Sequence, residues 1–479
     1  MSTKYYETLQ EKEINILRDA VDKADQKQAK KIINSSEIKT IFNIVETFIK
    51  DNSLICYGGS AINNILPLSD QFYNKNTQIP DYDFFSKNAL ADAKRLADIY
   101  FKNGFEEVEA KSGIHLGTYK VFVNFIPVAD ITQLDNSIFN NLKKDAIIVN
   151  HIHYAPPNYL KMAAYLELSR PAGDISRWEK VLKRLTLLNK NFPIKGKDCD
   201  INDFIKKFDN KNNNTDIFTT IKNTAIEEGL VFFGGFALML FSKYTSNNEK
   251  KLLANNPSFD LLSEHPKSTI DSIINKLKSQ GIKNIDFKKQ ENIGEIIPYH
   301  YILKVENNIV AFIYEPIACH SYNVIRMNDK IVKIATIDTM LSFYLAFLYA
   351  NKPYYNENRI LCIAEYLFKV QARNRFKQKG VLRRFSISCY GKQQTLANVR
   401  AEKAKKFKEL KYKRNSKDYE KYFLRYIPAD KNSKKTRKSR KTRKNRKTRK
   451  TRKTRKNRKT RKTRKTRKQK TRKSKSKTR

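Results

Sequence analysis

The sequence predicts a mixed α/β fold of the α+β type, in which one domain occurs twice and the second copy is degenerate. An apolar strand, a Gly-Gly turn and a helix follow one another in each half of the chain. Further motifs recur behind them in the same order, which indicates an internal duplication. The matched pairs are residues 54–61 with 230–237, 81–85 with 258–262, and 126–130 with 315–319.

Charge separates the chain into a body and a tail. The 479 residues carry 96 Lys and Arg against 48 Asp and Glu, a formal net charge of +48. Residues 434–479 hold 30 of the basic residues and no carboxylate. Such a segment has too little apolar surface to offset its ordering entropy. We expect a disordered basic tail that binds a polyanion, with a targeting signal or a packaging arm as alternatives.

The hydropathy pattern argues against membrane-spanning and exported proteins. No apolar run reaches the ~18–20 residues that cross a bilayer, and the first residues lack a secretory signal. The cysteines are odd in number, far apart and without a C-x-x-C pair, so we expect buried thiols in a reducing compartment. They are Cys56, Cys199, Cys319, Cys362 and Cys389.

The first copy of the domain is predicted at residues 36–192, after a helical segment at 1–35. Apolar residues at three- and four-residue steps predict a helix after Ser35. Polar residues 67–80 are interpreted as an inserted loop. Further elements are expected as strands at 54–57, 81–85 and 119–130, and helices from 61, at 89–100 and within 158–190.

The second copy is predicted at residues 193–380, beginning with a polar linker. It keeps the apolar frame of the first copy and loses polar residues. Basic and aromatic residues predict a helical extension at 381–433, followed by the tail. By sequence matching, Ser258 stands for Asp81, Cys319 for Asp130 and Phe236 for Ser60.

Three aspartates of the first copy are the candidate catalytic and metal-binding residues. Asp81 and Asp83 share one face of their strand, and Asp130 follows on a later strand. Adjacent strands lie ~4.8 Å apart, so the three carboxylates can meet. Carboxylates held so close repel one another unless a divalent cation lies between them. Their oxygens suit Mg²⁺ or Mn²⁺ in a two-ion site for nucleotidyl transfer.

The turn formed by Gly58, Gly59 and Ser60 is the candidate nucleotide-binding site. Two glycines let the backbone approach a triphosphate, and a helix start offers N–H groups to its oxygens. Lys161, Arg170 and Arg177 are candidate phosphate contacts that equally suit a solvated helix face.

These motifs resemble the nucleotidyltransferase superfamily of the DNA polymerase beta type. The segments YGGSAINNILP, PDYDFFS, NFIPVADIT, HYAPPNYLKMAAYLELSRP and RWEKVLKRL resemble, more closely, the poly(A) polymerase catalytic subunit of mimivirus-like and pox-type viruses. The resemblance covers roughly residues 36–380 and implies an active nucleotidyltransferase domain followed by an inactive one.

The resemblance also implies an activity. The expected reaction is template-independent transfer of adenylate from ATP to an RNA 3′ end, tailing viral mRNA. Expected partners are RNA and a second subunit, either a homodimer mate or a processivity factor, in virions and the host cytoplasm. Alternatives are a uridylyl- or CCA-adding enzyme, or a non-catalytic nucleic-acid packaging protein.

Overall fold

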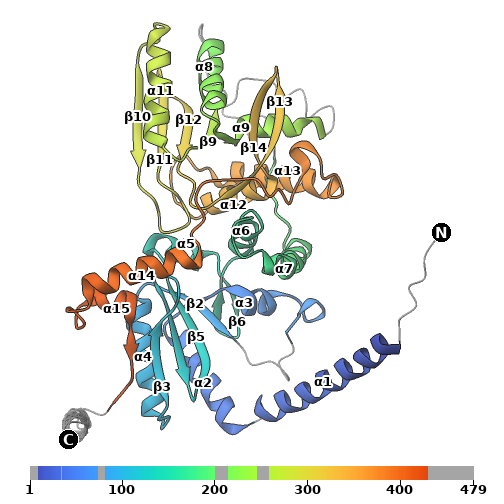
Figure 1. The fold of residues 1–479 in the computed structure, drawn as a ribbon, viewed down its shortest axis with the longest axis vertical. Helices are drawn as coiled ribbons and strands as arrows, with labels where there is room; N and C mark the ends of the chain where they lie inside the picture. Colours follow the sequence, from blue (N-terminus) through green and yellow to red (C-terminus); the bar gives the residue numbers. More distant parts are fainter. Residues whose placement is uncertain (1–8, 34, 74–80, 200–213, 245–257, 430–479) are drawn as a thin grey trace, which may run out of the picture.

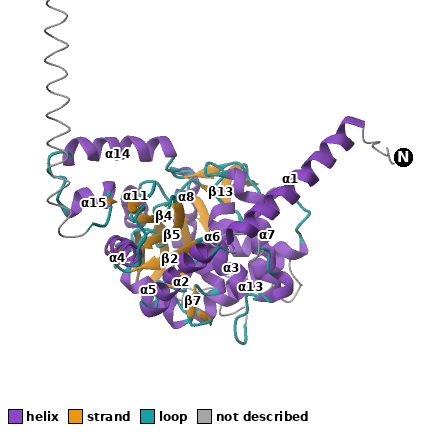
Figure 2. Ribbon diagram, turned by 90° about the horizontal axis from the view of Figure 1, so that it is seen from below, coloured by secondary structure: helices purple, strands orange, loops and turns teal. Residues whose placement is uncertain are grey.

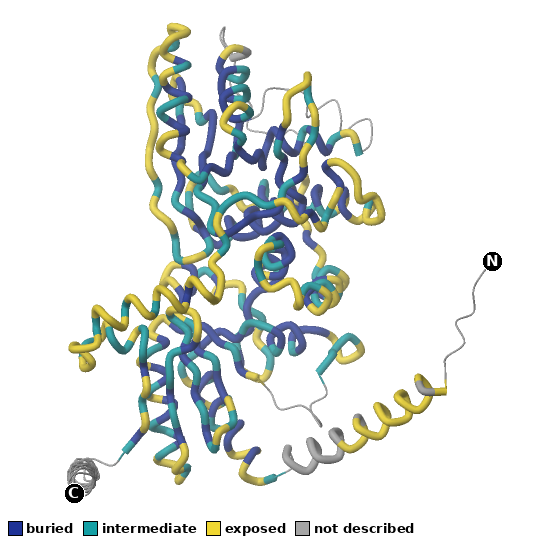
Figure 3. The backbone as a smooth tube through the Cα atoms, in the orientation of Figure 1, coloured by how far each residue is buried: buried dark blue, intermediate teal, exposed yellow. Residues whose placement is uncertain are grey.

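The computed structural model describes residues 9–33, 35–73, 81–199, 214–244 and 258–429 (Figure 1). The predicted tail therefore lies outside the described residues, as do parts of the predicted loop and linker. Two eight-stranded sheets form two halves that lie one above the other. Figure 3 shows the buried residues gathered in these sheets and in the helices between them. The mixed α/β fold with a repeated domain is confirmed.

Two helices open the chain and differ in burial. Helix α1 (Leu9–Ile33) extends away from the body (Figures 1 and 2). Several apolar side chains on it are exposed. Helix α2 (Ser36–Asp51) begins where expected, because the Ser35 hydroxyl accepts a hydrogen bond from the Ile38 N–H. Its predicted apolar face packs on the first sheet.

The first sheet combines parallel and antiparallel pairs. Its strand order is β16-β3-β4-β5-β2-β1-β7-β6. Helices α3 (Gly58–Ile65), α4 (Ala89–Lys102) and α5 (Asn136–Lys144) connect its strands, and η1 (Leu68–Asp70) follows α3. The strands are β1 (Ile55–Cys56), β2 (Tyr82–Ser86), β3 (Val108–Ser112), β4 (Thr118–Val123), β5 (Ile126–Gln133), β6 (Ile147–Val149), β7 (Ile152–Tyr154) and β16 (Arg425–Tyr426).

The single strand predicted at residues 119–130 is wrong. The chain instead forms a hairpin of β4 and β5 that turns at Asn124 and Phe125, both with positive φ. Two consecutive left-handed residues are the geometry of a tight hairpin turn, which usually contains glycine. Because Asn-Phe lacks that glycine signal, the sequence pattern concealed the turn.

The second sheet repeats the first. Its order is β10-β11-β12-β9-β8-β14-β13-β15. Seven consecutive strands of the second sheet therefore correspond, one to one, to seven strands of the first. The strands β10, β11, β12, β9, β8, β14 and β13 take the places of β3, β4, β5, β2, β1, β7 and β6. The bounds are β8 (Val231–Phe233), β9 (Phe259–Leu262), β10 (Ile285–Gln290), β11 (His300–Val305), β12 (Asn308–Tyr314), β13 (His320–Met327), β14 (Lys330–Ala335) and β15 (Cys389–Tyr390).

Strand register corrects one of the sequence matches between the copies. Asp83 pairs with Asp130 on parallel β2 and β5, and Asp260 pairs with Phe312 on parallel β9 and β12. Residues 128–131 (VADI) therefore match residues 310–313 (VAFI). The counterpart of Asp130 is Phe312, not Cys319, which lies just before β13. The ladder also shifts at equivalent places, after Val121 and after Leu303.

Equivalent helices hold the two halves together. Helix α6 (Pro157–Leu168) follows the first sheet and packs against α12 (Ile337–Phe347), which follows the second. All residues of α12 are buried, as expected of a helix enclosed between layers. The remaining helices of this part are η2 (Ile175–Arg177), α7 (Trp178–Asn191), α8 (Asn214–Glu227), α9 (Gly235–Phe241), η4 (Ser242–Tyr244), α11 (Pro266–Ser279) and α13 (Glu357–Arg373).

The stretch predicted as a helical extension contacts both halves. It contains η5 (Gly380–Leu382), α14 (Leu396–Leu410) and α15 (Lys417–Phe423). It also contains β15, which pairs with β13, and β16, which pairs with β3. Each sheet therefore gains an edge strand from this stretch, which the periodicity did not predict. Among the described residues, no helix is both long and apolar enough to cross a membrane.

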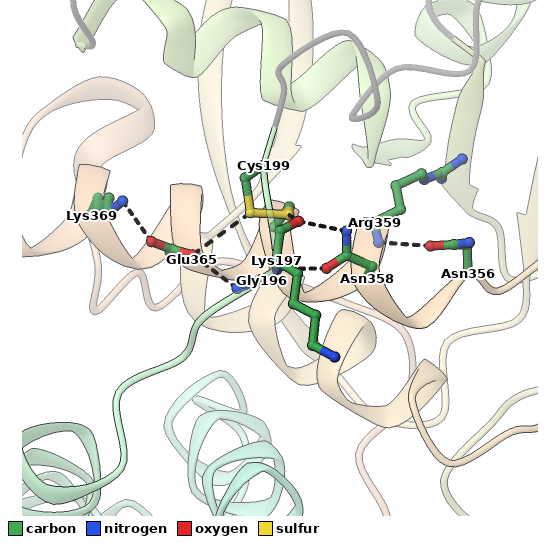
Figure 4. The surroundings of a disulfide bond; sticks show 9 residues. Gly196, Lys197, Cys199, Asn356, Asn358, Arg359, Glu365 and Lys369 are labelled. Atoms are coloured by element: carbon green, nitrogen blue, oxygen red, sulfur yellow. Dashed lines mark hydrogen bonds and ion pairs between the residues drawn. A yellow bond between two sulfur atoms is a disulfide. The ribbon is translucent and has the colours of Figure 1, made fainter.

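The prediction of free thiols is wrong for four of the five cysteines. Disulfides join Cys199 to Cys362 and Cys319 to Cys389, while Cys56 is free and buried. Figure 4 shows the first bond holding the segment after α7 against α13, where the Gly196 N–H donates to Glu365. The paired residues are 163 and 70 positions apart, so no local spacing pattern reveals them.

Candidate active site

The junction of β1 and α3 presents the Gly-Gly-Ser turn. Gly58 has a φ of +75° and begins α3. A Cβ at this position would lie 2.6 Å from Asp83 Oδ2, so glycine lets the carboxylate approach the backbone. The Ser60 hydroxyl donates a 2.7 Å hydrogen bond to the backbone carbonyl of Asp81. The turn and the Asp-x-Asp motif therefore form one unit.

The structure brings the three predicted aspartates to one place. Asp83 and Asp130 are direct partners on adjacent strands, and Asp81 lies immediately before β2. Asp81 is exposed, whereas Asp83 and Asp130 are half-buried. The site is thus open to solvent on the side of Asp81.

Burial and repulsion between neighbouring carboxylates raise the pKa values of Asp81 and Asp83. Burial raises the pKa of Asp83 to about 7, with further increases from Asp81 and Asp130. Burial and Asp130 also raise the pKa of Asp81. Perturbed carboxylates gathered in this way are typical of sites that bind metal or handle protons.

Lys120 partly compensates this negative charge. It lies opposite Asp130 in the β4–β5 ladder, and its Nζ forms an ion pair with Asp130 Oδ2. Its charge lowers the pKa of both Asp81 and Asp83 against the raising effects. Lys120 was not predicted from the sequence. The alternation of β4 places it on the face of Asp130 only once the β4–β5 hairpin is known.

The donor set suits a divalent cation, but its oxygens are not arranged as a finished site. Within the described ranges, no three His, Cys, Asp or Glu side chains converge as a metal-binding group. Aspartate carboxylates are nevertheless the hard oxygen ligands that Mg²⁺ and Mn²⁺ select, and two of the three, Asp81 and Asp83, have pKa values raised by their neighbours. Lys120 holds one of the two oxygens of Asp130, so an ion that binds through Oδ2 would displace it.

Asp83→Asn is expected to stabilise the metal-free protein above about pH 4. The raised pKa of Asp83 makes its ionisation costly in the fold, so its favourable contribution is complete below the unfolded pKa near 3.8 and is lost as pH rises through about 7. The stability advantage of the variant should grow up to about pH 7 and then level off. Urea unfolding between pH 4 and 8 measures it, and a constant difference would contradict this cause.

A basic and aromatic cavity of about 430 Å³ adjoins the turn. A Cβ on Gly59 would lie 2.5 Å from Tyr73 Oη and 2.8 Å from an Arg184 Nη, so both groups cover the first turn of α3. Arg184 donates a 2.6 Å hydrogen bond to Tyr73 and lies over its ring. The lining residues are Phe72, Tyr73, Ser176, Glu179, Lys180, Lys183, Arg184 and Leu187.

Helix α7 carries the cations of this cavity. Lys180, Lys183 and Arg184 share one helix face by their three- and four-residue spacing. That spacing was visible in the sequence, but nothing there showed that the face turns toward Gly59. Lys180 also lowers the pKa of Asp81, which places its charge within reach of the aspartates.

The phosphate contacts considered from sequence occupy other positions. Lys161 is buried and its Nζ donates to the Phe192 carbonyl. Burial lowers the pKa of Arg170 to about 10. Arg177 pairs with Glu167 at 3.2 Å, although its charge also lowers the pKa of Asp83. Arg177 therefore acts electrostatically on Asp83 although it pairs with Glu167.

The second copy keeps the frame of this site without its carboxylate set. Gly234 has a φ of +83° and lies against Asp260, as Gly58 lies against Asp83. Ser258 and Phe312 stand where the first copy has Asp81 and Asp130. The glycine–aspartate contact is therefore common to both copies, whereas the three-carboxylate group belongs to the first.

The chain matches one protein family, several viral relatives in sequence, and a solved structure in fold. Residues 43–174 match the family described as Poly(A) polymerase catalytic subunit. A protein of Acanthamoeba polyphaga mimivirus, provisionally named a poly(A) polymerase catalytic subunit, is 25% identical over 371 residues, 76% of this chain and 56% of the relative. One of African swine fever virus with the same provisional name is 33% identical over 171 residues, 34% of this chain and 36% of the relative.

The fold has a solved counterpart. The crystal structure of the Megavirus polyadenylate synthase matches with a TM-score of 0.72 and 20% identity, covering 92% of this chain and 91% of that one. The chain spans about half or less of the curated relatives' lengths. The resemblance expected from the motifs is thereby confirmed: this chain is similar, in sequence and in fold, to viral poly(A) polymerase catalytic subunits.

Proposed function

We propose that this chain is a polynucleotide adenylyltransferase that adds adenylate from ATP to the 3′ end of RNA without a template. The observation that carries the proposal is the position of Asp81, Asp83 and Asp130 on and beside two adjacent strands, against the Gly-Gly turn. The loss of two of these carboxylates in the second copy supports it, because the fold persists without them. Viral relatives make viral mRNA the natural substrate to propose, in virions and the host cytoplasm.

The proposed reaction forms one bond and breaks one. The RNA 3′ oxygen bonds to the α-phosphorus of ATP, the bond from that phosphorus to the oxygen bridging to the β-phosphate breaks, and pyrophosphate leaves with that oxygen. Asp81, Asp83 and Asp130 would hold Mg²⁺ or Mn²⁺, which when bound promotes loss of the hydroxyl proton to solvent and stabilises phosphoryl charge. The three aspartates would determine where the cation is held.

The cavity beside Gly59 would hold the polyphosphate of ATP. Arg184 offers a planar guanidinium that suits phosphate oxygens, and its bond to Tyr73 fixes its orientation. Lys180 and Lys183 add charge from the same helix face. Backbone N–H groups at the start of α3 favour the same anion.

Gly59→Ala is expected to raise the KM for ATP by about tenfold, the equivalent of one weakened charged hydrogen bond. The added Cβ would collide with the ends of Tyr73 and Arg184 and displace them, while the backbone remains unstrained. Steady-state kinetics measures the change, with Gly235→Ala in the second copy as the matched control. An unchanged KM would show that Arg184 does not contact the nucleotide.

Incubation with each nucleotide separately tests the activity. Purified protein, a labelled RNA primer and Mg²⁺ or Mn²⁺ are mixed with ATP, CTP, GTP or UTP, and the products are separated by length. We expect long extension with ATP. Preference for UTP or for CTP would instead support the uridylyl- or CCA-adding alternatives. No incorporation of any nucleotide would support a non-catalytic nucleic-acid packaging protein.

Deleting residues 434–479 is expected to weaken RNA binding and to reduce its dependence on salt. The 30 basic residues of the tail would release counterions from RNA phosphates without reading sequence. Binding isotherms at several salt concentrations, with ATP binding as the control, measure the effect. An unchanged salt slope would favour a targeting or packaging role.

We also propose a division of labour between the two copies. Residues 36–192 would catalyse, and residues 193–380 would serve as an RNA platform or an assembly surface. The persistence of the second frame without the carboxylate set supports this division. A second copy of the chain or a processivity subunit remains the proposed protein partner.

A further inference from the structure

Lys120 lies within the proposed catalytic group without being a ligand. It faces Asp130 across the β4–β5 ladder and forms an ion pair with its Oδ2. The lysine side chain is 36% exposed and the aspartate 18%, so the ammonium has water into which it can move.

Comparison of the two copies shows whether the sheet requires the ion pair of Lys120 and Asp130. The register that matches Asp130 with Phe312 also matches Lys120 with Ile302. Neighbouring positions keep their character, since Tyr119 matches Tyr301. Lysine and aspartate have thus been replaced together by buried apolar residues in a sheet of the same topology.

The pair is therefore linked to the carboxylate site more closely than to the sheet. An ion pair that remains in contact with water contributes little to the stability of a sheet. The second copy keeps an aspartate, Asp260, at the position of Asp83, but it has Ile302 at the position of Lys120. The lysine is thus present in the copy that has Asp130. It is absent from the second copy, although that copy keeps the contact between glycine and aspartate.

We propose that Lys120 is a positioning residue: it is the resident counter-ion of Asp130 and competes with the divalent cation for that carboxylate. The inference rests on the proposed function, because it assumes that Asp130 is a metal ligand. An ammonium bound to Oδ2 takes one of the two oxygens of Asp130 and offsets the negative charge that would attract a cation. A cation that binds through Oδ2, alone or together with Oδ1, displaces the ammonium from Asp130.

Binding of Mn²⁺ to the full chain without RNA or ATP tests the competition. Lys120→Met is expected to tighten Mn²⁺ binding, measured by electron paramagnetic resonance, by about tenfold, the worth of one charge-assisted hydrogen bond. Lys120→Arg keeps the charge and should bind nearly as the wild type does. Lys111→Met, on neighbouring β3, is the matched control and should leave the affinity unchanged.

The Asp130→Asn background shows which carboxylate is contested. If Lys120 competes at Asp130, adding Lys120→Met to Asp130→Asn should produce no further gain. The proposal is overturned if Lys120→Met binds Mn²⁺ no more tightly than the wild type, or if the gain persists without Asp130. Melting curves establish that each variant is folded.

The two proposals fail in different ways. Absence of nucleotide incorporation with tighter Mn²⁺ binding in Lys120→Met would reject adenylyl transfer and keep the competition. Normal adenylyl transfer with unaltered Mn²⁺ affinity would reject the role of Lys120 alone.

Discussion

Asp83→Asn is expected to lower the rate of adenylate incorporation on the order of a thousandfold, equivalent to about 4 kcal/mol of transition-state stabilisation. Asp83 is the central member of the three-carboxylate group, since it pairs with Asp130 on β5 and lies two residues after Asp81. Asparagine keeps the size of the side chain and removes its charge, so the loss is electrostatic. Single-turnover primer extension with saturating ATP measures the effect.

Asp260→Asn is the matched control for this variant. Asp260 occupies the equivalent place in the second sheet, against Gly234 and opposite Phe312. We expect its replacement to leave the incorporation rate within about twofold once folding is verified. Asp260 lies in the copy without the three-carboxylate group, and substitutions away from such sites usually have small effects. Equal rates for wild type and Asp83→Asn would remove the basis of the proposed mechanism.

Arg384→Met is expected to destabilise the protein by roughly 3–5 kcal/mol, because it leaves a buried carboxylate without its counter-ion. The Asp338 side chain in the first turn of α12 is 1% exposed and that of Arg384 17%. Arg384 donates from Nε and Nη2 to the Asp338 carboxylate at 2.9–3.0 Å, and Gln371 donates a further hydrogen bond. Burial raises the pKa of Asp338 while Arg384 opposes that rise.

Urea unfolding measures this loss against Arg383→Met, an exposed neighbour on the same segment. The control should change the free energy of unfolding by less than about 0.5 kcal/mol. A second variant, Asp338→Leu with Arg384→Met, should recover much of the loss because no unpaired charge remains. Equal stability of Arg384→Met and the wild type would show that the pair does not hold the C-terminal stretch to α12.

The active-site motifs could be identified from sequence because their signals are local. Helix α2 follows from apolar spacing and the Ser35 cap, and the β1–α3 turn follows from Gly58 and Gly59. The aspartates were placed by their position on short apolar strands. Each of these features depends on residues within one or two turns of one another, where side-chain periodicity is directly visible.

Several partners were missed because they come from distant parts of the chain. Arg184 covers Gly59 from a helix more than a hundred residues later, and β15 and β16 join sheets formed long before them. Lys120 was missed for a different reason, since the Asn-Phe turn hid the hairpin that opposes it to Asp130. The cysteine pairs join residues that no spacing rule connects.

The sequence by itself determined that this protein repeats one domain, that its first copy carries Asp81, Asp83 and Asp130, and that viral poly(A) polymerase subunits resemble it. Only the tertiary structure decided which residues oppose one another, matching Asp130 with Phe312 and placing Lys120 on Asp130. The physical reason is strand register. Backbone N–H and C=O groups can pair in many alignments whatever the side chains are, so the packing of the whole sheet selects the alignment and no local motif does.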